Sequence, residues 1–286
     1  MTASLLNARP IARSLLFVPG HQPARFDKAC QSGADAVVLD LEDAVPPDHK
    51  DEARGLVADW LAARAAARQV DTGPVIGVRI NPAQTPWHDA DLALCARAGV
   101  AAVMLPKAED AALLLALAAA LPGAALWPLI ETARGIDRLP AIAAGPGVER
   151  LVFGSIDFQA DLDIESDEDG SGSELLLFRS QIVLASRLAG LQAPVDGVST
   201  AIDQPARVEA EARRARALGF GAKLCIHPKQ VAAVNLGFSP TAERIAWAER
   251  VLAADAASGG APVAVDGKMI DRPVVLKAQA VLRAVR

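Results

Sequence analysis

The sequence has few of the residues that mark disulfide-rich or nucleic-acid-binding proteins. Its three cysteines, Cys30, Cys95 and Cys225, are widely spaced and form no C-x-x-C pair, which argues against a disulfide framework and a zinc knuckle. Aromatic residues make up only 4% of the chain, and no basic run occurs. Together with a net charge of -5, these features exclude an electrostatic nucleic-acid surface.

Long hydrophobic runs are also missing. The longest extends from Ala111 to Leu121, which is too short to span a bilayer, and Pro122 and Gly123 close it, so it predicts a packed helix. The segment from Met1 to Pro10 has neither a sustained apolar core nor a small-residue cleavage pattern. We therefore expect a cytoplasmic protein with no membrane partner.

The composition that remains is typical of a globular protein with a large interior. Hydrophobic residues make up 52% of the chain and charged residues 22%. A length of 286 residues is large for one ordinary core but normal for a single α/β barrel.

Short β-rich runs alternate with helical stretches of ten to twenty residues, a pattern typical of parallel strands joined by crossover helices. A doubly wound open sheet usually has about five or six strands, whereas eight runs favour a (β/α)8 TIM barrel over residues 1–237. The predicted strands are Ser14–Pro19, Ala36–Leu41, Val75–Ile80, Ala102–Leu105, Ala125–Ile130, Arg150–Ile156, Val195–Ser199 and Ala222–His227.

Residues 238–286 follow the eighth predicted strand and are not needed to close a barrel. Helical patterns from Thr241 to Ala257 and from about Pro273 predict an additional C-terminal helical lid or arm. We expect this segment to pack outside the barrel, on a neighbouring subunit.

Two apolar strands are predicted to present a carboxylate at their ends. The stretch Leu129–Gly135 delivers Glu131, and Leu151–Asp157 repeats the design with Asp157. Either acid alone is ordinarily a helix cap or an ion-pair partner. Because an unpaired carboxylate is costly at such a place unless a cation compensates it, the two together predict a divalent-metal site.

Basic residues are predicted at the same end of the barrel. Arg79 ends the third strand just before Asn81-Pro82 and offers a planar fork for a substrate carboxylate; the alternative is a salt bridge with a neighbouring acid. Lys107 follows the fourth strand, and the amine of a lysine at this place could form a Schiff base with a carbonyl substrate. A metal and a catalytic lysine are alternative means of stabilising an enolate, so the acidic pair disfavours this role.

Six motifs in the same order resemble those of the citrate lyase beta subunit-like branch of the HpcH/HpaI aldolase family. The likeness extends from about Arg13 to the C-terminus. The motifs are Arg13–Gly20, Val38–Val45, Arg79–Asn81, Leu105–Lys107, Ile130–Gly135 and Gly221–Pro228.

The resemblance implies a (β/α)8 barrel, usually trimeric or hexameric, that acts on 3-hydroxyacyl thioesters. Its implied site residues fall into four groups by role. They are Glu131 and Asp157 as Mg²⁺ ligands, Arg79 with Glu131 as the substrate-binding residues, Glu42 and Asp43 as acids that hold water at the metal, and Arg25 and Lys28 as contacts to the phosphates of a CoA or acyl-carrier arm. Asp271 resembles the acid that the lid presents to a neighbouring active site.

The implied reaction is a retro-Claisen cleavage of a malyl-, citramalyl- or citryl-CoA type substrate into acetyl-CoA and a 2-oxo acid. Asp271 would protonate the thioester enolate. Two alternatives remain: a metal-dependent aldolase on free 2-oxo acids, and the beta subunit of a multi-subunit citrate lyase that acts on an acyl-carrier partner.

Overall fold

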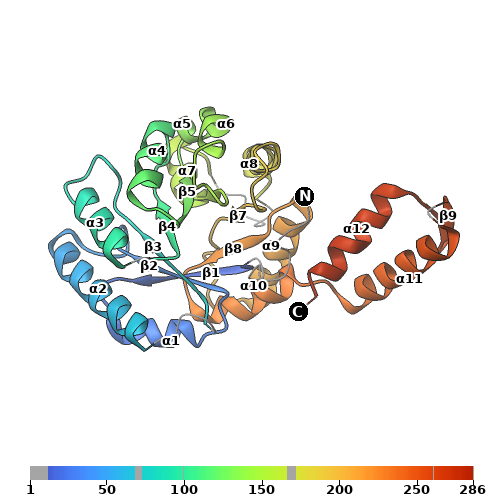
Figure 1. Cartoon of the computed structure of the whole chain (residues 1–286), viewed down its shortest axis with the longest axis horizontal. Coiled ribbons are helices and arrows are strands. Elements are labelled where there is room, and N and C mark those ends of the chain that lie inside the picture. Colours follow the sequence, from blue (N-terminus) through green and yellow to red (C-terminus); the bar gives the residue numbers. More distant parts are fainter. Residues whose placement is uncertain (1–11, 68–72, 99, 166–171, 260, 286) are drawn as a thin grey trace. The chain divides into compact units, whose positions relative to one another are not determined.

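Eight parallel strands form a closed barrel, in the computed structural model of the chain (Figure 1). The structure describes residues 12–67, 73–98, 100–165, 172–259 and 261–285. Strands β1 to β8 pair in sequence order, and β8 closes the barrel on β1 through Ser14 opposite Lys223. Helices surround the strands, as parallel crossovers require. The predicted (β/α)8 barrel is confirmed.

The strands of the barrel are β1 (Ser14–Pro19), β2 (Ala36–Asp40), β3 (Val75–Arg79), β4 (Ala102–Leu105), β5 (Ala125–Ile130), β6 (Val152–Phe153), β7 (Val195–Asp196) and β8 (Ala222–Cys225). Its α-helices are α1 (Phe26–Cys30), α2 (Lys50–Ala66), α3 (His88–Ala98), α4 (Ala111–Ala120), α5 (Ala133–Asp137), α6 (Leu139–Ala143), α7 (Ser155–Leu162), α8 (Leu176–Leu188), α9 (Pro205–Leu218) and α10 (Val231–Phe238). Short 3₁₀ turns are η1 (Pro23–Arg25), η2 (Pro47–His49), η3 (Ser173–Leu175) and η4 (Pro228–Gln230).

The sixth strand is much shorter than predicted. Only Val152 and Phe153 pair with neighbouring strands, and Ser155 already begins α7. The prediction that a strand delivers Asp157 at its end is therefore wrong, because Asp157 lies in the first turn of α7. An acidic side chain is favourable there because helix N-termini carry a partial positive charge.

The barrel interior is filled by alternate residues of the strands. Leu15, Val38, Met104, Leu129 and Leu224 belong to one buried hydrophobic cluster, and each is at most 3% exposed. Strand residues alternate between the two faces of a sheet, so the intervening residues face the surrounding helices. This packed interior leaves space for chemistry only beyond the strand ends.

A buried charged network lies on the outer face of the sheet, where helices cover β7 and β8. Asp196 accepts hydrogen bonds from Arg179 Nε at 2.9 Å and from Lys223 Nζ at 3.1 Å. Burial raises the pKa of the Asp196 carboxyl, but the two cations lower it by more, so the net pKa lies below its ordinary value. The ion pairs therefore favour the charged form of Asp196 in the folded protein.

We expect the Asp196 network to make the free energy of unfolding fall as the pH is lowered into the acidic range. A depressed folded-state pKa stabilises the fold above the unfolded-state pKa of about 3.9, and this contribution is lost as the pH falls through the lower folded-state value. Asp196→Asn should cost about 2 kcal/mol at pH 7. Urea unfolding from pH 7 to pH 3 should show a smaller acid-induced loss in the variant than in the parent. Equal losses in both proteins would contradict the assignment.

Residues 236–286 form a second compact unit, separate from residues 1–235. It contains α11 (Ala242–Ser258), β9 (Val263–Val265), β10 (Lys268–Ile270) and α12 (Arg272–Arg283). Val251 and Val275 pack in its own buried cluster. The β9–β10 hairpin turns at Asp266 and Gly267, both at positive φ. The Asp-Gly pair is the sequence signal that predicts such a turn, and our prediction of a helical segment omitted it.

Among the described residues, no helix combines the length and the hydrophobicity needed to cross a bilayer.

Candidate active site

Arg79 lies at the end of β3, where it meets a carboxylate from the neighbouring strand. Its Nε donates to Asp40 Oδ1 at 2.7 Å and its Nη2 donates to Asp40 Oδ2 at 2.6 Å. Strands β2 and β3 place these residues opposite each other in register. Both are buried, so this two-point ion pair is protected from water.

The remaining edge of the Arg79 guanidinium faces two more acids. Nη1 lies 2.9 Å from Glu42 Oε2 and 3.4 Å from Asp43 Oδ2. The guanidinium carbon also lies 4.6 Å from the centre of the Phe17 ring, a cation–π contact. The alternative predicted for Arg79, an ion pair with a neighbouring acid, is thus present, and the residue also lines the cavity described below.

Glu42 is the most strongly perturbed acid of this group. Burial raises the pKa of its carboxyl to about 8, and Arg79 only partly offsets that effect. Lys50 lies behind it and donates from Nζ to the carbonyl oxygens of Leu41 and Glu42 and to Asn81 Oδ1, at 2.7 to 2.8 Å. The three hydrogens of this ammonium are therefore all used in holding the β2 loop.

Glu131 directly follows β5. Its carboxylate is held in place by a backbone N–H group and not by another side chain. Its Oε1 accepts from the Lys107 N–H at 2.7 Å. Lys107 has φ of 47°, a left-handed conformation that costs a non-glycine residue about 1–2 kcal/mol. Burial raises the pKa of the Glu131 carboxyl to about 7; the Lys107 N–H lowers it and Asp157 raises it. Lys107 thus contributes its backbone here, while its side chain is exposed.

Gly154 leaves room for the other oxygen of Glu131. A Cβ at position 154 would lie 2.6 Å from Glu131 Oε2 and 2.6 Å from Glu131 Cβ, which is closer than real contacts allow. Gly154 also precedes the first turn of α7 and provides no capping side chain. Any larger residue at this position would displace the carboxylate.

A small cavity brings three of the predicted residues together. Its volume is about 50 Å³, and Arg79, Glu131 and Asp157 all line it. The remaining lining is mainly apolar and consists of Phe17, Leu129, Phe153, Gly154, Ser155, Ile156, Val198 and Leu224. The structure thus places the three residues in one site.

The donor set of this cavity fits a divalent cation. Glu131 and Asp157 supply hard oxygen ligands, and buried Glu131 needs a positive partner to stay charged at neutral pH. Within the described residues no group of three or more potential protein ligands occurs. Two carboxylates would leave most positions of a six-coordinate Mg²⁺ to water and substrate oxygens.

Five other predicted residues are not among those that line this cavity, and two of them, Glu42 and Asp43, contact Arg79 instead. Arg25 ends the η1 turn after β1, and Lys28 lies in α1; both are exposed. Asp271 belongs to the second unit, where it caps α12 by accepting from the Val274 N–H at 3.3 Å. A helix cap is thus the role that Asp271 has within its own chain.

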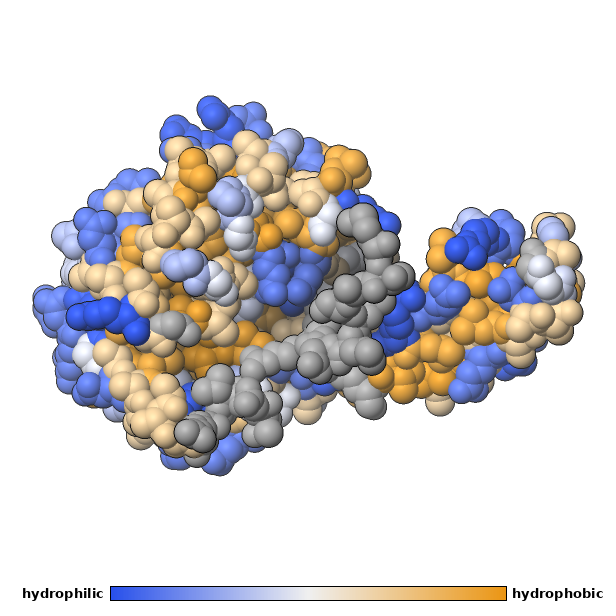
Figure 2. Space-filling view, in the orientation of Figure 1, coloured by the Kyte–Doolittle hydropathy of each residue, from blue (hydrophilic) through white to orange (hydrophobic). Residues whose placement is uncertain are grey.

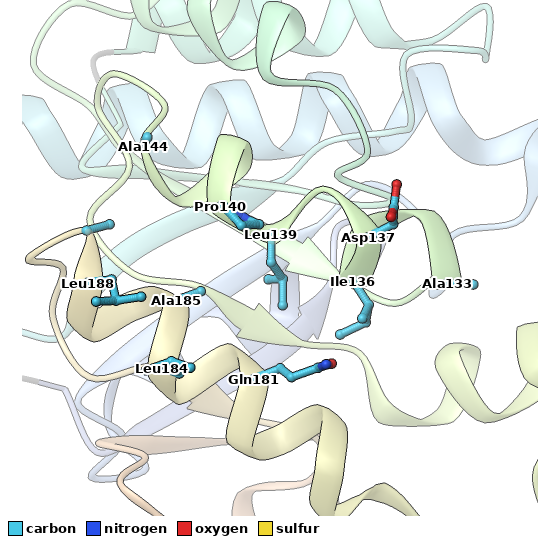
Figure 3. A pocket seen from close by; sticks show the side chains of 11 residues that line it. Ala133, Ile136, Asp137, Leu139, Pro140, Ala144, Gln181, Leu184, Ala185 and Leu188 are labelled. Atoms are coloured by element: carbon cyan, nitrogen blue, oxygen red, sulfur yellow. The ribbon is translucent and has the colours of Figure 1, made fainter.

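A larger cavity of about 740 Å³ lies among the outer helices. Figure 3 shows Ile136 and Leu139 pointing from α5 and α6 toward α8, which contributes Leu184 and Leu188. Over the visible face of the barrel unit, hydrophobic and hydrophilic residues are intermixed (Figure 2). Among the described residues, Asp137 is the only titratable one that lines this larger cavity. The larger cavity therefore lacks the cluster of charged side chains found at the strand ends.

Two features of the site were missed in the sequence. The sequence predicted a neighbouring acid as an alternative partner of Arg79 but did not identify which one, because the pairing with Asp40 depends on strand register. The role of Gly154 depends on a close approach to Glu131 across the barrel wall. A glycine inside a predicted strand, as Gly154 is in Arg150–Ile156, is the local signal for such an approach.

Fold and site together define an enzyme built on a parallel α/β barrel. The cavity at its strand ends is lined by two carboxylates and one arginine. The chain matches the model of the HpcH/HpaI aldolase/citrate lyase family over residues 13–228 and belongs to this family. Members of the family are lyases, so the resemblance and the expectation of a carbon–carbon lyase are confirmed at this level.

Two curated relatives align along most of the chain. A (3S)-malyl-CoA thioesterase of Cereibacter sphaeroides is 36% identical over 274 residues, covering 94% of this chain and 93% of the relative. A citrate lyase subunit beta-like protein of Deinococcus radiodurans is 37% identical over 288 residues, covering 97% and 99%.

A solved structure is similar over nearly the whole chain. It is the crystal structure of CitE from Mycobacterium tuberculosis in complex with magnesium, acetoacetate and coenzyme A. The TM-score is 0.82 at 35% sequence identity, and the match covers 96% of this chain and 98% of the other.

Proposed function

We propose that this protein is a Mg²⁺-dependent lyase that cleaves a 3-hydroxyacyl-CoA thioester into acetyl-CoA and a 2-oxo acid. The observation that carries the proposal is the single cavity lined by Glu131, Asp157 and Arg79. Relatives that act on or bind CoA compounds, one of them solved with magnesium and coenzyme A, support the substrate class.

In this proposal Glu131 and Asp157 hold Mg²⁺, which when bound stabilises negative charge developing on the oxygens of the oxo-acid half. Lys107 fixes Glu131 through its backbone N–H, and the absence of a side chain at Gly154 leaves room for the second carboxylate oxygen. Arg79 lines the cavity and would bind the substrate carboxylate through Nη1, whose contact with Asp43 is the longest of its ion pairs. Asp40 holds the rest of that guanidinium in place.

The reaction conserves atoms and electrons without an added oxidant. The substrate hydroxyl gives its proton to water in the site, the C–C bond breaks as the carbonyl of the oxo acid forms, and the electron pair of that bond becomes the enolate of the acetyl thioester. Asp271, presented by the second unit of a neighbouring subunit, donates a proton to the enolate carbon. Glu42 and Asp43 hold the arginine and orient water beside the cation.

An assay of the purified chain tests the proposal. Malyl-CoA, citramalyl-CoA and citryl-CoA are each supplied with Mg²⁺ or with EDTA, and oxo acid and free thiol are both measured. Mg²⁺-dependent oxo acid without free thiol is the expected result. Free thiol released together with free hydroxy acid would instead favour hydrolysis, the activity named for the Cereibacter relative.

Arg25 tests whether the thioester arm is recognised. Arg25 and Lys28 are exposed beside the end of β1, and we propose that they contact the phosphates of CoA. Arg25→Ala is expected to raise KM for the CoA ester about tenfold while kcat changes little, because a uniform binding contact is lost. An unchanged KM would favour the alternative of an aldolase on free 2-oxo acids.

We also propose a homotrimer or hexamer with residues 238–286 acting as a lid on a neighbouring subunit. Asp271→Asn and Glu131→Gln proteins are each expected to be nearly inactive, whereas a mixture that has exchanged subunits should recover part of the activity. Light scattering gives the subunit number, and differently tagged proteins verify exchange. No recovery after verified exchange would contradict a shared site.

Residues 1–237 would then be the catalytic domain. If the pure chain turns over no free CoA ester but gains activity with an acyl-carrier protein, the beta-subunit alternative would replace the free-CoA lyase.

A further inference from the structure

We infer that a second copy of this chain docks on the outer side of α8, through a two-fold contact in which the two α8 helices lie antiparallel. The contact surface is formed by the exposed leucines of α8 and by the larger cavity between α8 and the α5–α6 segment. This surface shares no lining residue with the strand-end cavity, and the inference does not depend on the proposed lyase function.

The outer side of α8 is apolar. Leu177, Leu184 and Leu188 are 63%, 59% and 79% exposed. Together with exposed Gln181 they recur at spacings of four, three and four residues, so they form one stripe along the helix. This is the spacing by which one helix packs along another, with a polar residue among the leucines fixing the register.

The neighbouring outer helix α9 has a different exposed side. It carries charged pairs, in which Arg207 contacts Glu211 and Arg213 contacts Glu209. Charged residues are expected on the side of a surface helix that faces water. A stripe of exposed leucines beside an apolar cavity is instead typical of an interface with another protein.

The contact surface has a ridge and a groove, which makes it complementary to itself. Leu184 and Leu188 form the ridge on α8, and Ile136, Leu139 and Pro140 line the cavity beside it (Figure 3). In a two-fold contact the same patch of each copy meets its equivalent, so the ridge of one copy fills the cavity of the other. One chain thus supplies both halves of the contact.

The length of α8 suits an antiparallel pair. Leu177 and Leu188 lie about 16 Å apart along the helix axis. An antiparallel copy places its Leu188 beside Leu177 and its Leu184 beside Gln181, so the whole stripe is covered. The 13 residues of α8 are too few for a stable helix pair on their own, so filling the cavity supplies the rest of the buried apolar surface.

The charges around the cavity fit the same arrangement. Figure 3 shows Asp137 at the end of the cavity where Gln181 lies, with Leu188 at the other end. The Asp137 side chain contacts Arg138 at 3.2 Å but remains 76% exposed. Arg187 is exposed next to Leu188 and has no ion pair within the described part of the chain. The antiparallel contact brings Arg187 of the second copy to Asp137.

This contact is additional to the lid contact proposed above. A ring closed by the second unit uses one interface, and a two-fold contact through α8 joins two such rings. The assembly is therefore expected to have an even number of subunits, which means a hexamer if the ring has three.

Size-exclusion chromatography with light scattering tests the contact on the full chain. The parent is expected to have an even number of subunits, and Leu184→Glu should halve that number because it places a carboxylate in an apolar interface. Leu115→Glu, at a leucine of α4 that is 61% exposed, is the matched control and should keep the parent mass. An odd number of subunits in the parent, or an unchanged mass of Leu184→Glu, overturns the inference.

A charge exchange tests the antiparallel pairing and leaves the leucines in place. Asp137→Arg and Arg187→Asp are each expected to weaken association at least about tenfold, because like charges then face each other. The double variant restores opposite charges and should recover most of the parent affinity, measured by sedimentation velocity over a dilution series. A double variant that associates no better than the single variants overturns the pairing.

Other occupants of the cavity give different results. If the second unit of a neighbouring subunit lay there, Leu184→Glu would break the ring and a hexamer would fall to monomers. If a small apolar molecule lay there, the mass of Leu184→Glu would equal that of the parent. Both results overturn the inference, and an unchanged melting temperature of the dissociated variant would show that its fold is retained.

Discussion

Replacing Glu131 with glutamine is expected to lower kcat/KM for the CoA ester by at least about a thousandfold, because one of two anionic oxygen ligands is lost. The glutamine carbonyl can still accept the Lys107 N–H that now bonds Oε1 at 2.7 Å, so the local geometry should persist. Mg²⁺ affinity measured by calorimetry should fall with the activity. Unchanged turnover would exclude Glu131 as a metal ligand.

The melting temperature distinguishes a loss of metal binding in Glu131→Gln from unfolding of the variant. Burial raises the pKa of Glu131 to about 7, so its charged form destabilises the fold above that pH in the absence of a cation. Glu131→Gln removes that cost, and its melting temperature at pH 8 without Mg²⁺ should be no lower than that of the parent. Glu209→Gln, in an exposed pair on α9, is the control and should leave activity unchanged. A large loss of stability in Glu131→Gln would show that its main role is structural.

Removal of the Arg79 side chain is expected to have the largest effect on stability. Arg79→Ala leaves the buried carboxylates of Asp40 and Glu42 without their cation, which should cost about 3–5 kcal/mol of unfolding free energy. Urea unfolding at pH 7 measures the loss. A cost below about 1 kcal/mol would show that the ion pairs contribute little.

Two further variants separate the structural and substrate roles of Arg79. Arg79→Lys keeps the charge but loses the two-point geometry with Asp40, so it should be destabilised less than Arg79→Ala while kcat/KM still falls strongly. Arg213→Ala removes an arginine from an exposed pair with Glu209 and should cost under about 1 kcal/mol. A fully active Arg79→Lys protein would contradict the proposed binding of the substrate carboxylate.

Much of the barrel follows from local pattern. Strands β1, β4 and β5 have the predicted bounds. Strands buried on both faces are continuous apolar runs, which stand out between polar helices. The prediction was weakest at β6 and β7, where two paired residues each are enough to close the barrel but too few to give a periodic signal.

The sequence by itself determined the parallel barrel and the residues that gather at its strand ends, because hydrophobic periodicity and chain order fix which end of each strand a polar residue occupies. Only the tertiary structure decided how those residues are partnered. The pairing of Arg79 with Asp40 depends on strand register, and the support of Glu131 by Lys107 depends on a left-handed backbone. Both are contacts between segments more than twenty residues apart, which no local pattern encodes.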